Sequence, residues 1–287
     1  MERHALHTVR AAAGDEEGEG GDVNGFDLPV RFSHLKAYGK SALHGHHART
    51  AAEDDPTQSM ERGTAVHAIL FGNKKVCGYP GKVRNGKQFE AFCAEHADHE
   101  ILTMADFDKA RRMADAVQAH KLAWPLLQGV QEETLLFRWN GINCRSTPDV
   151  RGADFITELK SGATCDPARF VWHSLRMQYH AQMAMESIAF ARKNSGARPA
   201  DCFIVAVEQS PPHAVQVYRL EDRALQAGEK LLMLWSERLK VCEASGSFPA
   251  YTETVMPLDV PDEEEELVFS DDGPPARGTA FDYATQA

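Results

Sequence analysis

The hydrophobic period changes four times along this chain between that of helices and that of strands, and these changes limit the folds that it can adopt. Apolar residues recur at helical spacing in the first part of the chain, over residues 32–47, 59–71 and 103–127. The period of strands follows over residues 133–141, 142–150 and 154–161. Asn140-Gly141 and Arg151-Gly152 supply turns between these three strands. This order is typical neither of an all-helical nor of an all-β protein.

The pattern then returns to a helix and continues with two strands and a last helix. Residues 166–196 predict one long helix, with Asp166 as the N-cap, Pro167 in the first turn and Gly196 at the end. Strands are predicted over residues 201–209 and 213–220, and a helix over 222–243. The sequence therefore predicts the α/β class, with a mixed central β-sheet flanked by helices.

Charge divides the chain into one domain and two acidic ends. The net charge is −11, of which residues 1–28 hold −5 and residues 259–287 hold −8, so residues 29–258 carry +2. We predict disordered acidic segments at 1–28 and 259–287 around a single domain at 29–258. The near-neutral domain leaves a DNA partner open.

Several classes of protein are disfavoured by composition. No window of about 18 apolar residues exists, and the first residues lack an apolar signal-peptide core, so we expect a cytoplasmic protein with no membrane partner. The six cysteines include no C-x-x-C pair, which argues against a zinc ribbon or an iron–sulfur site.

The stretch PDVRGADFITELK, residues 148–160, carries the strongest chemical signal. Side chains alternate along a strand, so Glu158 and Lys160 share a face while Leu159 points into the core. The turn brings Asp149 toward Glu158, and two adjacent carboxylates favour a cation between them. Such oxygen ligands suit Mg²⁺ or Mn²⁺, and Lys160 can hold a water or steady phosphate charge. This pattern in isolation is more often a solvated surface pair, and only its context favours phosphodiester hydrolysis.

Five stretches in sequence order resemble the PD-(D/E)XK nuclease superfamily, and in particular RecE-type (exonuclease VIII-like) phage exonucleases. They cover roughly residues 32–190, and the individual matches are short. They are FSHLKAYGKSALH (32–44), RGTAVHAILFG (62–72, similar to the family's GTAxHA helix), CRSTPDV (144–150), the PD-x8-ELK hairpin (148–160) and QYHAQMAM (178–185, similar to the family's YHxQ helix).

The resemblance implies a restriction-endonuclease-like PD-(D/E)XK core at residues 29–258 and a metal-dependent deoxyribonuclease. The expected activity is a Mg²⁺-dependent exonuclease, with Mn²⁺ as a substitute, that degrades DNA from double-stranded ends in phage-type recombination or DNA processing. We expect the 5′-to-3′ direction, although the sequence fixes neither polarity nor processivity. Expected partners are double-stranded DNA ends, a single-strand annealing protein and, by analogy, further copies of the chain in a ring, in a bacterium or a phage-infected host.

The same resemblance assigns roles to particular residues. Asp149 and Glu158 would be metal ligands and Lys160 would orient the attacking water. His67 of the GTAxHA-like helix would also approach the metal, although a buried histidine is more often a packing residue. Tyr179 and Gln182 lie three residues apart on one helix face and would support the site or contact DNA, and plain packing is the alternative.

A further acid upstream of the hairpin matches an additional carboxylate of the family, and either Glu132 or Glu133 could supply it. If these residues continue a strand, they point to opposite faces. We favour Glu132, which would then share a face with Thr134 and Leu136.

Other functions remain open at this point. One is a structure-specific or restriction-like endonuclease on the same fold, which would cut covalently closed DNA. Another is a catalytically silent DNA-binding recombination partner, although a decayed site usually loses one member of the Asp149, Glu158 and Lys160 set. A third is a docking module that acts through residues 259–287.

Overall fold

The computed structural model describes residues 28–52 and 55–257, so the predicted acidic ends, apart from residue 28, lie outside the described residues. The helices are α1 Phe32–Lys40, α2 Ala42–Thr50, α3 Gln58–Phe71, α4 Gly86–Glu95, α5 Met104–Ala119, α6 Ala123–Leu126, α7 Pro167–Met177, α8 Tyr179–Lys193 and α9 Asp222–Ser245. The strands are β1 Lys75–Tyr79, β2 His99–Thr103, β3 Val130–Gln131, β4 Leu135–Trp139, β5 Ile142–Ser146, β6 Val150–Arg151, β7 Phe155–Gly162, β8 Asp201–Glu208 and β9 Val215–Arg219.

The central sheet has five strands in the order β3-β6-β7-β8-β9. The β7–β8 pair is parallel and every other pair is antiparallel, so the sheet is mixed, as predicted. The parallel pair requires a crossover, which α7 and α8 provide. Separate two-stranded sheets are formed by β1 with β2 and by β4 with β5.

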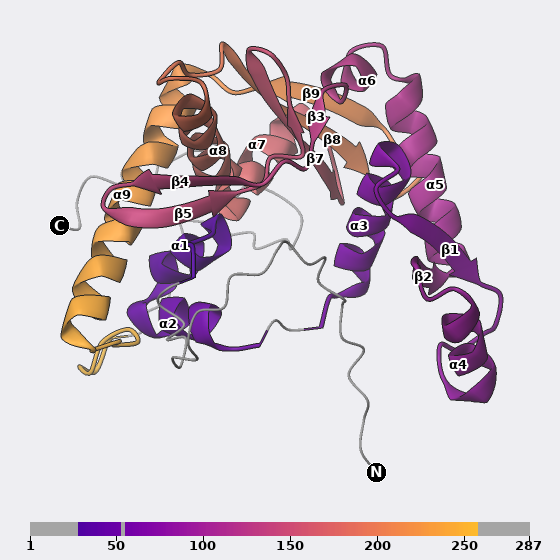
Figure 1. Ribbon diagram of the computed structural model, residues 1–287, viewed down its shortest axis with the longest axis horizontal. Coiled ribbons are helices and arrows are strands. Elements are labelled where there is room, and N and C mark those ends of the chain that lie inside the picture. Colours follow the sequence, from indigo (N-terminus) through magenta and orange to yellow (C-terminus); the bar gives the residue numbers. More distant parts are fainter. Residues whose placement is uncertain (1–27, 53–54, 258–287) are drawn as a thin grey trace, which may run out of the picture.

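Helices cover both faces of the sheet, and β7 lies at its centre. Leu159 of β7 packs into a core cluster that also contains residues of α3, α5 and α6, while Ile156 packs on the opposite face with residues of α7 and α8. Figure 1 shows α3 and α5 on one side of the central strands and α8 and α9 on the other. Burial on both faces explains the apolar run of β8, the parallel partner of β7, because Val205 packs in the first of these clusters and Ile204 in the second.

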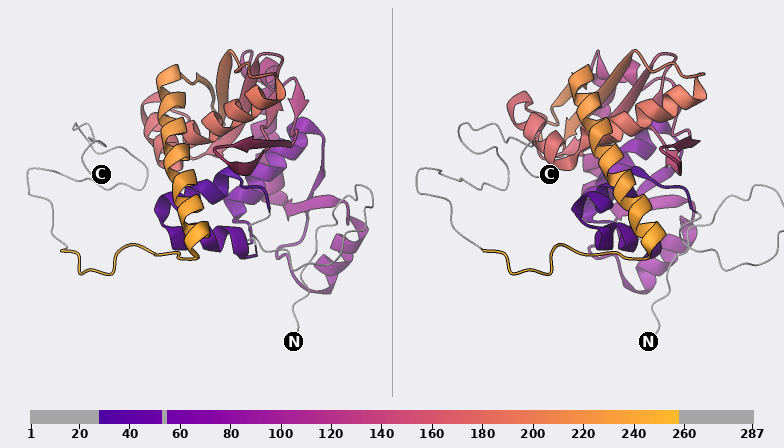
Figure 2. Two further views of the ribbon diagram at one scale, coloured as in Figure 1. Left: turned by 60° about the vertical axis from the view of Figure 1, so that its left-hand side comes forward. Right: turned by 90° about the vertical axis from the view of Figure 1, so that its left-hand side faces the viewer.

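A third core cluster lies between α1, α8, α9 and the β4–β5 hairpin, and it includes Leu35, Tyr38 and Trp235. Figure 2 shows the long α9 running beside α1 and α2. The small parallel pair β1–β2 and the helix α4 between them lie at the edge of the molecule next to α3 and α5 (Figure 1). These three elements were not predicted.

Three predicted helices end earlier than expected. The helix predicted at 32–47 is divided at Ser41, whose side chain accepts a hydrogen bond from the backbone N–H of His44 and starts a new helix. The helix predicted at 166–196 is divided at Gln178, which has a φ of 60°. The helix predicted at 103–127 ends at Ala119, and Pro125 lies in the separate short helix α6.

The strand predicted at 142–150 was also wrong as a single element. Its first half is β5, which pairs with β4, and its second half is β6, which belongs to the central sheet. Pro148 lies between them, and proline lacks the N–H that a continuous ladder would need. Because the chain leaves the β4–β5 pair before Pro148, Asp149 lies at the start of the β6–β7 hairpin in the central sheet.

The predicted apolar stripe of residues 59–71, the helix cap at Asp166 and the turn at Asn140-Gly141 were confirmed. Helix α3 has Ala65 and Leu70 buried, with Ile69 packed against the same cluster, and Asp166 caps α7. The turn residues Asn140 and Gly141 both have positive φ, as a tight hairpin requires. Within the described ranges, no helix is long and apolar enough to span a membrane.

Candidate active site

The β6–β7 hairpin brings Asp149 and Glu158 together, as predicted. The backbone N–H of Asp149 donates to Oε1 of Glu158 at 3.1 Å, and Oδ2 of Asp149 accepts the backbone N–H of Leu159 at 2.7 Å. These two bonds tie each carboxylate to the opposite strand. Glu158 is only 2% exposed, so the acids are not a solvated surface pair.

Lys160 points to the same face as Glu158, in agreement with strand alternation. Its Nζ donates to Oε2 of Glu158 at 2.5 Å and lies 5.3 Å from the centre of the Tyr179 ring. Tyr179 begins α8, so the lysine lies between the central strand and the helix that covers it. The ion pair fixes the ammonium group beside the two carboxylates.

The electrostatics of the three groups follow from their burial together. Burial and the charge of Asp149 raise the pKa of Glu158. Burial would raise the pKa of Asp149, but the neighbouring His67 and Lys160 outweigh it and lower the pKa. Burial would lower the pKa of Lys160, but the charges of Glu158 and Asp149 outweigh it and raise the pKa. The two acids still repel each other, and a bound metal cation would relieve this repulsion.

His67 reaches Asp149 from the other side of the sheet. It lies on α3, and its Nδ1 is 3.4 Å from Oδ1 of Asp149. Burial would lower the pKa of this histidine, but Asp149 outweighs burial and raises it. The contact joins residues far apart in the sequence and places His67 at the predicted position beside the acids.

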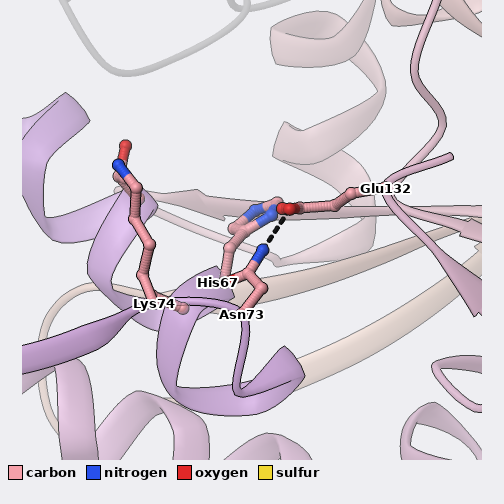
Figure 3. A pocket seen from close by; sticks show the side chains of 6 residues that line it. His67, Asn73, Lys74 and Glu132 are labelled. Atoms are coloured by element: carbon pink, nitrogen blue, oxygen red, sulfur yellow. Dashed lines mark hydrogen bonds between the residues drawn. The ribbon is translucent and has the colours of Figure 1, made fainter. Parts of the chain in front are cut away.

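A pocket of about 240 Å³ opens next to His67 and contains Glu132. Figure 3 shows the Glu132 carboxylate meeting the side-chain amide of Asn73, which donates a hydrogen bond to it. Glu133 instead pairs with Arg151 and Lys193. Of the two acids, Glu132 is the one that shares a pocket with His67.

The reason given for preferring Glu132 was wrong. The prediction placed it on a strand with Thr134 and Leu136, but β3 ends at Gln131 and β4 begins at Leu135. Glu132 has a φ of 48° in the link between them. A residue in this left-handed conformation does not follow strand alternation, so the backbone turn decides where its side chain points.

Gln182 and Glu186 extend the site along α8. The Nε2 atom of Gln182 donates to Oε2 of Glu158 at 2.7 Å and to Oε1 of Glu186 at 2.9 Å. Glu186 was not predicted. It is 2% exposed, and its Oε2 has no hydrogen-bond partner within the described part of the chain. Its spacing of four residues from Gln182 was the available signal, because such residues are neighbours on a helix.

The donor set fits a hard divalent cation in its chemistry. Asp149 and Glu158 offer carboxylate oxygens and His67 an imidazole nitrogen, and oxygen ligands suit Mg²⁺ or Mn²⁺. In the conformation described, hydrogen bonds from Lys160 and Gln182 occupy Oε2 of Glu158. Over residues 28–52 and 55–257, no three His, Cys, Asp or Glu side chains already converge as a metal site. Binding would therefore require these side chains to exchange partners.

Burial and the charge of Glu158 raise the pKa of Glu186 well above its usual range. The folded chain therefore binds the carboxyl proton of Glu186 more tightly than the unfolded chain does. The free energy of unfolding then falls as the pH rises from the pKa of Glu186 in the unfolded chain to its pKa in the folded chain. We expect Glu186→Gln to be about 1–3 kcal/mol more stable than wild type near pH 8, and the gain to shrink near pH 5. Urea denaturation in a chelator measures this difference, and an equal gain at both pH values would contradict it.

A comparison with solved structures supports the fold. A crystal structure described as a "Putative exonuclease" from Eubacterium rectale matches with a TM-score of 0.59 and 14% sequence identity, covering 88% of this chain and 99% of that chain. A crystal structure of SSO0001 matches at 12% identity, with 76% and 95% of the two chains covered, but its TM-score of 0.27 carries no argument. No curated protein matches.

The sequence profile of one family matches residues 31–258, which is most of the chain. The matched range contains the whole β6–β7 hairpin, α3 and α8, and hence Asp149, Glu158, Lys160 and His67. The mixed sheet flanked by helices is the core that the sequence predicted. The chain belongs to the family described as the PDDEXK-like domain of unknown function (DUF3799).

Proposed function

We propose that this chain is a divalent-metal-dependent deoxyribonuclease that degrades DNA from double-stranded ends. One observation carries the proposal: Asp149, the buried Glu158 and the partly buried Lys160 meet on one hairpin and are joined to His67 of α3, in a PDDEXK-like chain. Charged groups that are gathered and partly buried in this way are costly to fold unless they are paired, and such a group next to a pocket lined by His67 is typical of a functional site.

Each side chain of the site has its own role in the proposed hydrolysis. Asp149 and Glu158 would hold the cation, with His67 beside them. When bound, Mg²⁺ supplies Lewis-acid polarisation and offsets charge on the phosphate. Lys160 donates a hydrogen bond to the attacking water and opposes the negative charge that develops as the P–O bond breaks. Gln182 keeps Glu158 in place, and Glu132 faces the pocket next to His67, where it can bind the nucleophilic water or a further cation.

The type of cleavage, the metal, the direction and the partners are proposed from the structural neighbour and from the sequence resemblance. The described neighbour from Eubacterium rectale favours an exonuclease, and the RecE-type resemblance of the five stretches favours Mg²⁺, the 5′-to-3′ direction and a place in phage-type recombination. By the same resemblance we propose double-stranded DNA ends as the substrate, a ring-shaped homo-oligomer and a single-strand annealing protein as a partner, in the cytoplasm of a bacterium or an infected host.

The test compares DNA with and without ends. Purified full-length protein is incubated with linear duplex labelled at its 5′ or its 3′ end and with covalently closed circular DNA, in Mg²⁺ or in chelator. Glu158→Ala serves as the inactive control. We expect metal-dependent loss of the linear DNA alone, absent in the variant, with the 5′ label released first. Nicking of closed circles would assign the endonuclease instead, and intact DNA in every sample would refute hydrolysis.

A further inference from the structure

Helix α7 exposes an apolar stripe to solvent. Val171, Trp172 and Leu175 are 51%, 52% and 47% exposed, and their spacing of one, three and four residues places them on one side of the helix. The opposite side is buried through Phe170, whose ring stacks on that of Tyr218. We call the three exposed residues the α7 stripe. Contiguous apolar exposure of this kind marks an interaction surface.

The stripe lies close to the candidate active site. His173 of α7 contacts Tyr179, with 3.4 Å between its Nε2 and the tyrosine hydroxyl, and the Tyr179 ring in turn lies below the Lys160 ammonium. At the end of α7, Lys36 of α1 donates to the backbone carbonyl of Met177 at 2.9 Å. The helix that carries the stripe is therefore anchored to the residues around Lys160.

Positive charge lies between the stripe and the site. Arg169 and Arg176 are exposed on α7 about a quarter of a turn from the stripe, on the side that leads to His173. Burial and the charge of Arg176 lower the pKa of His173. Burial, Lys40 and Lys160 lower the pKa of Lys36, so these lysines lie within electrostatic reach of one another. This group of cations would attract an anionic backbone to the neighbourhood of Lys160.

We propose that the α7 stripe binds the unpaired bases of a DNA end, with Trp172 stacking on a base while Arg169, Arg176 and Lys36 meet the phosphates. An aromatic side chain beside a row of cations is the arrangement that binds single-stranded DNA without reading its sequence. Apolar side chains alone would equally suit a second copy of the chain, but the flanking charge is complementary to phosphate. The inference rests on the proposed function, because the active site supplies the reason for DNA to be there.

The first test uses tryptophan fluorescence, because stacking on a base quenches an indole. Full-length protein in chelator is titrated with a short oligothymidylate. We expect wild type to be quenched, Trp172→Phe to lose most of the quench and Trp139→Phe, which removes a half-buried indole of β4, to keep it. Equal quenching of wild type and Trp172→Phe, or none in wild type, would overturn the proposal.

The second test measures affinity for duplex DNA with a single-stranded overhang, again in chelator. We expect Trp172→Ala to bind about tenfold more weakly and to bind blunt duplex nearly as wild type does. Val241→Ala, which removes an exposed apolar residue of α9, is the matched control and should change neither affinity. An unchanged affinity of Trp172→Ala for the overhang would overturn the proposal.

The molar mass measured by light scattering distinguishes a stripe that binds DNA from one that binds a second copy of the chain. If Trp172→Ala dissociates an oligomer while Trp172→Phe binds DNA and is quenched as wild type is, the stripe contacts a second copy and the proposal fails. Binding and quenching are measured without hydrolysis. A protein that is quenched through Trp172 but degrades no DNA would therefore refute the proposed function and leave the base-binding surface standing.

Discussion

Lys160→Ala is expected to slow metal-dependent DNA hydrolysis by about 10³-fold while the chain still unfolds cooperatively. The ammonium group lies 2.5 Å from Oε2 of Glu158, and its charge also acts on Asp149. Its loss removes the donor for the attacking water and the charge that opposes the developing phosphate charge. Single-turnover hydrolysis of linear duplex at saturating protein measures the chemical step, because weaker DNA binding then has no effect on the rate.

Two further variants test whether the loss of activity comes from the charge of Lys160. Lys160→Met keeps the apolar stem beside Tyr179 and removes only the charge, so it should lose activity as Lys160→Ala does. Lys230→Ala removes an exposed lysine of α9 and should hydrolyse DNA at the wild-type rate. If Lys160→Met retained wild-type hydrolysis, Lys160 would have no chemical role, and the proposed division of work in the site would be wrong.

Gly228→Ala is expected to destabilise the fold by about 2–3 kcal/mol, although alanine is the better helix former. Gly228 lies where α9 crosses the start of α8, and an added Cβ would be 2.3 Å from the backbone oxygen of His180 and 2.9 Å from Cα of Ala181. Backbone atoms cannot rotate away as a flexible side chain can. The two helices must therefore separate, which opens the core around Leu232.

Urea denaturation measures this loss, and Gly162→Ala is the matched control. A Cβ at Gly162 meets nothing closer than 4.0 Å, so the same substitution there should change the free energy of unfolding by less than about 1 kcal/mol. Gly228→Ala should also lower activity, since α8 carries Gln182 and Glu186. A variant as stable as wild type would mean that α9 shifts at no cost.

The predictions succeeded where neighbours in the sequence are also neighbours in space. Asp149, Glu158 and Lys160 lie within one hairpin, and the two-residue period of a strand was enough to place Glu158 and Lys160 on one face. Asp166 could be recognised as a helix cap for the same reason. The roles of these acids and of the lysine in catalysis stay predictions.

Helix ends were predicted less well, because they depend on tertiary contacts. Residues 166–196 have helical spacing throughout, yet Gln178 adopts a left-handed backbone and redirects the chain. The break lets α7 reach Tyr218 while α8 packs on α9. The residue types around Gln178 do not predict this turn, because glutamine at positive φ is disfavoured. The packing of α7 and α8 on either side stabilises this conformation.

By itself, the sequence determined the α/β class, the hairpin and its three chemical groups, because each depends on local period and turn residues. Only the tertiary structure decided that His67 meets Asp149, that Glu132 rather than Glu133 faces the pocket, and that Glu186 lies buried beside Gln182. Each of these contacts joins separate helices or strands or follows a left-handed turn. Their positions are fixed by how α3, α8 and the central sheet pack together, and the spacing of residues along the chain does not encode that packing.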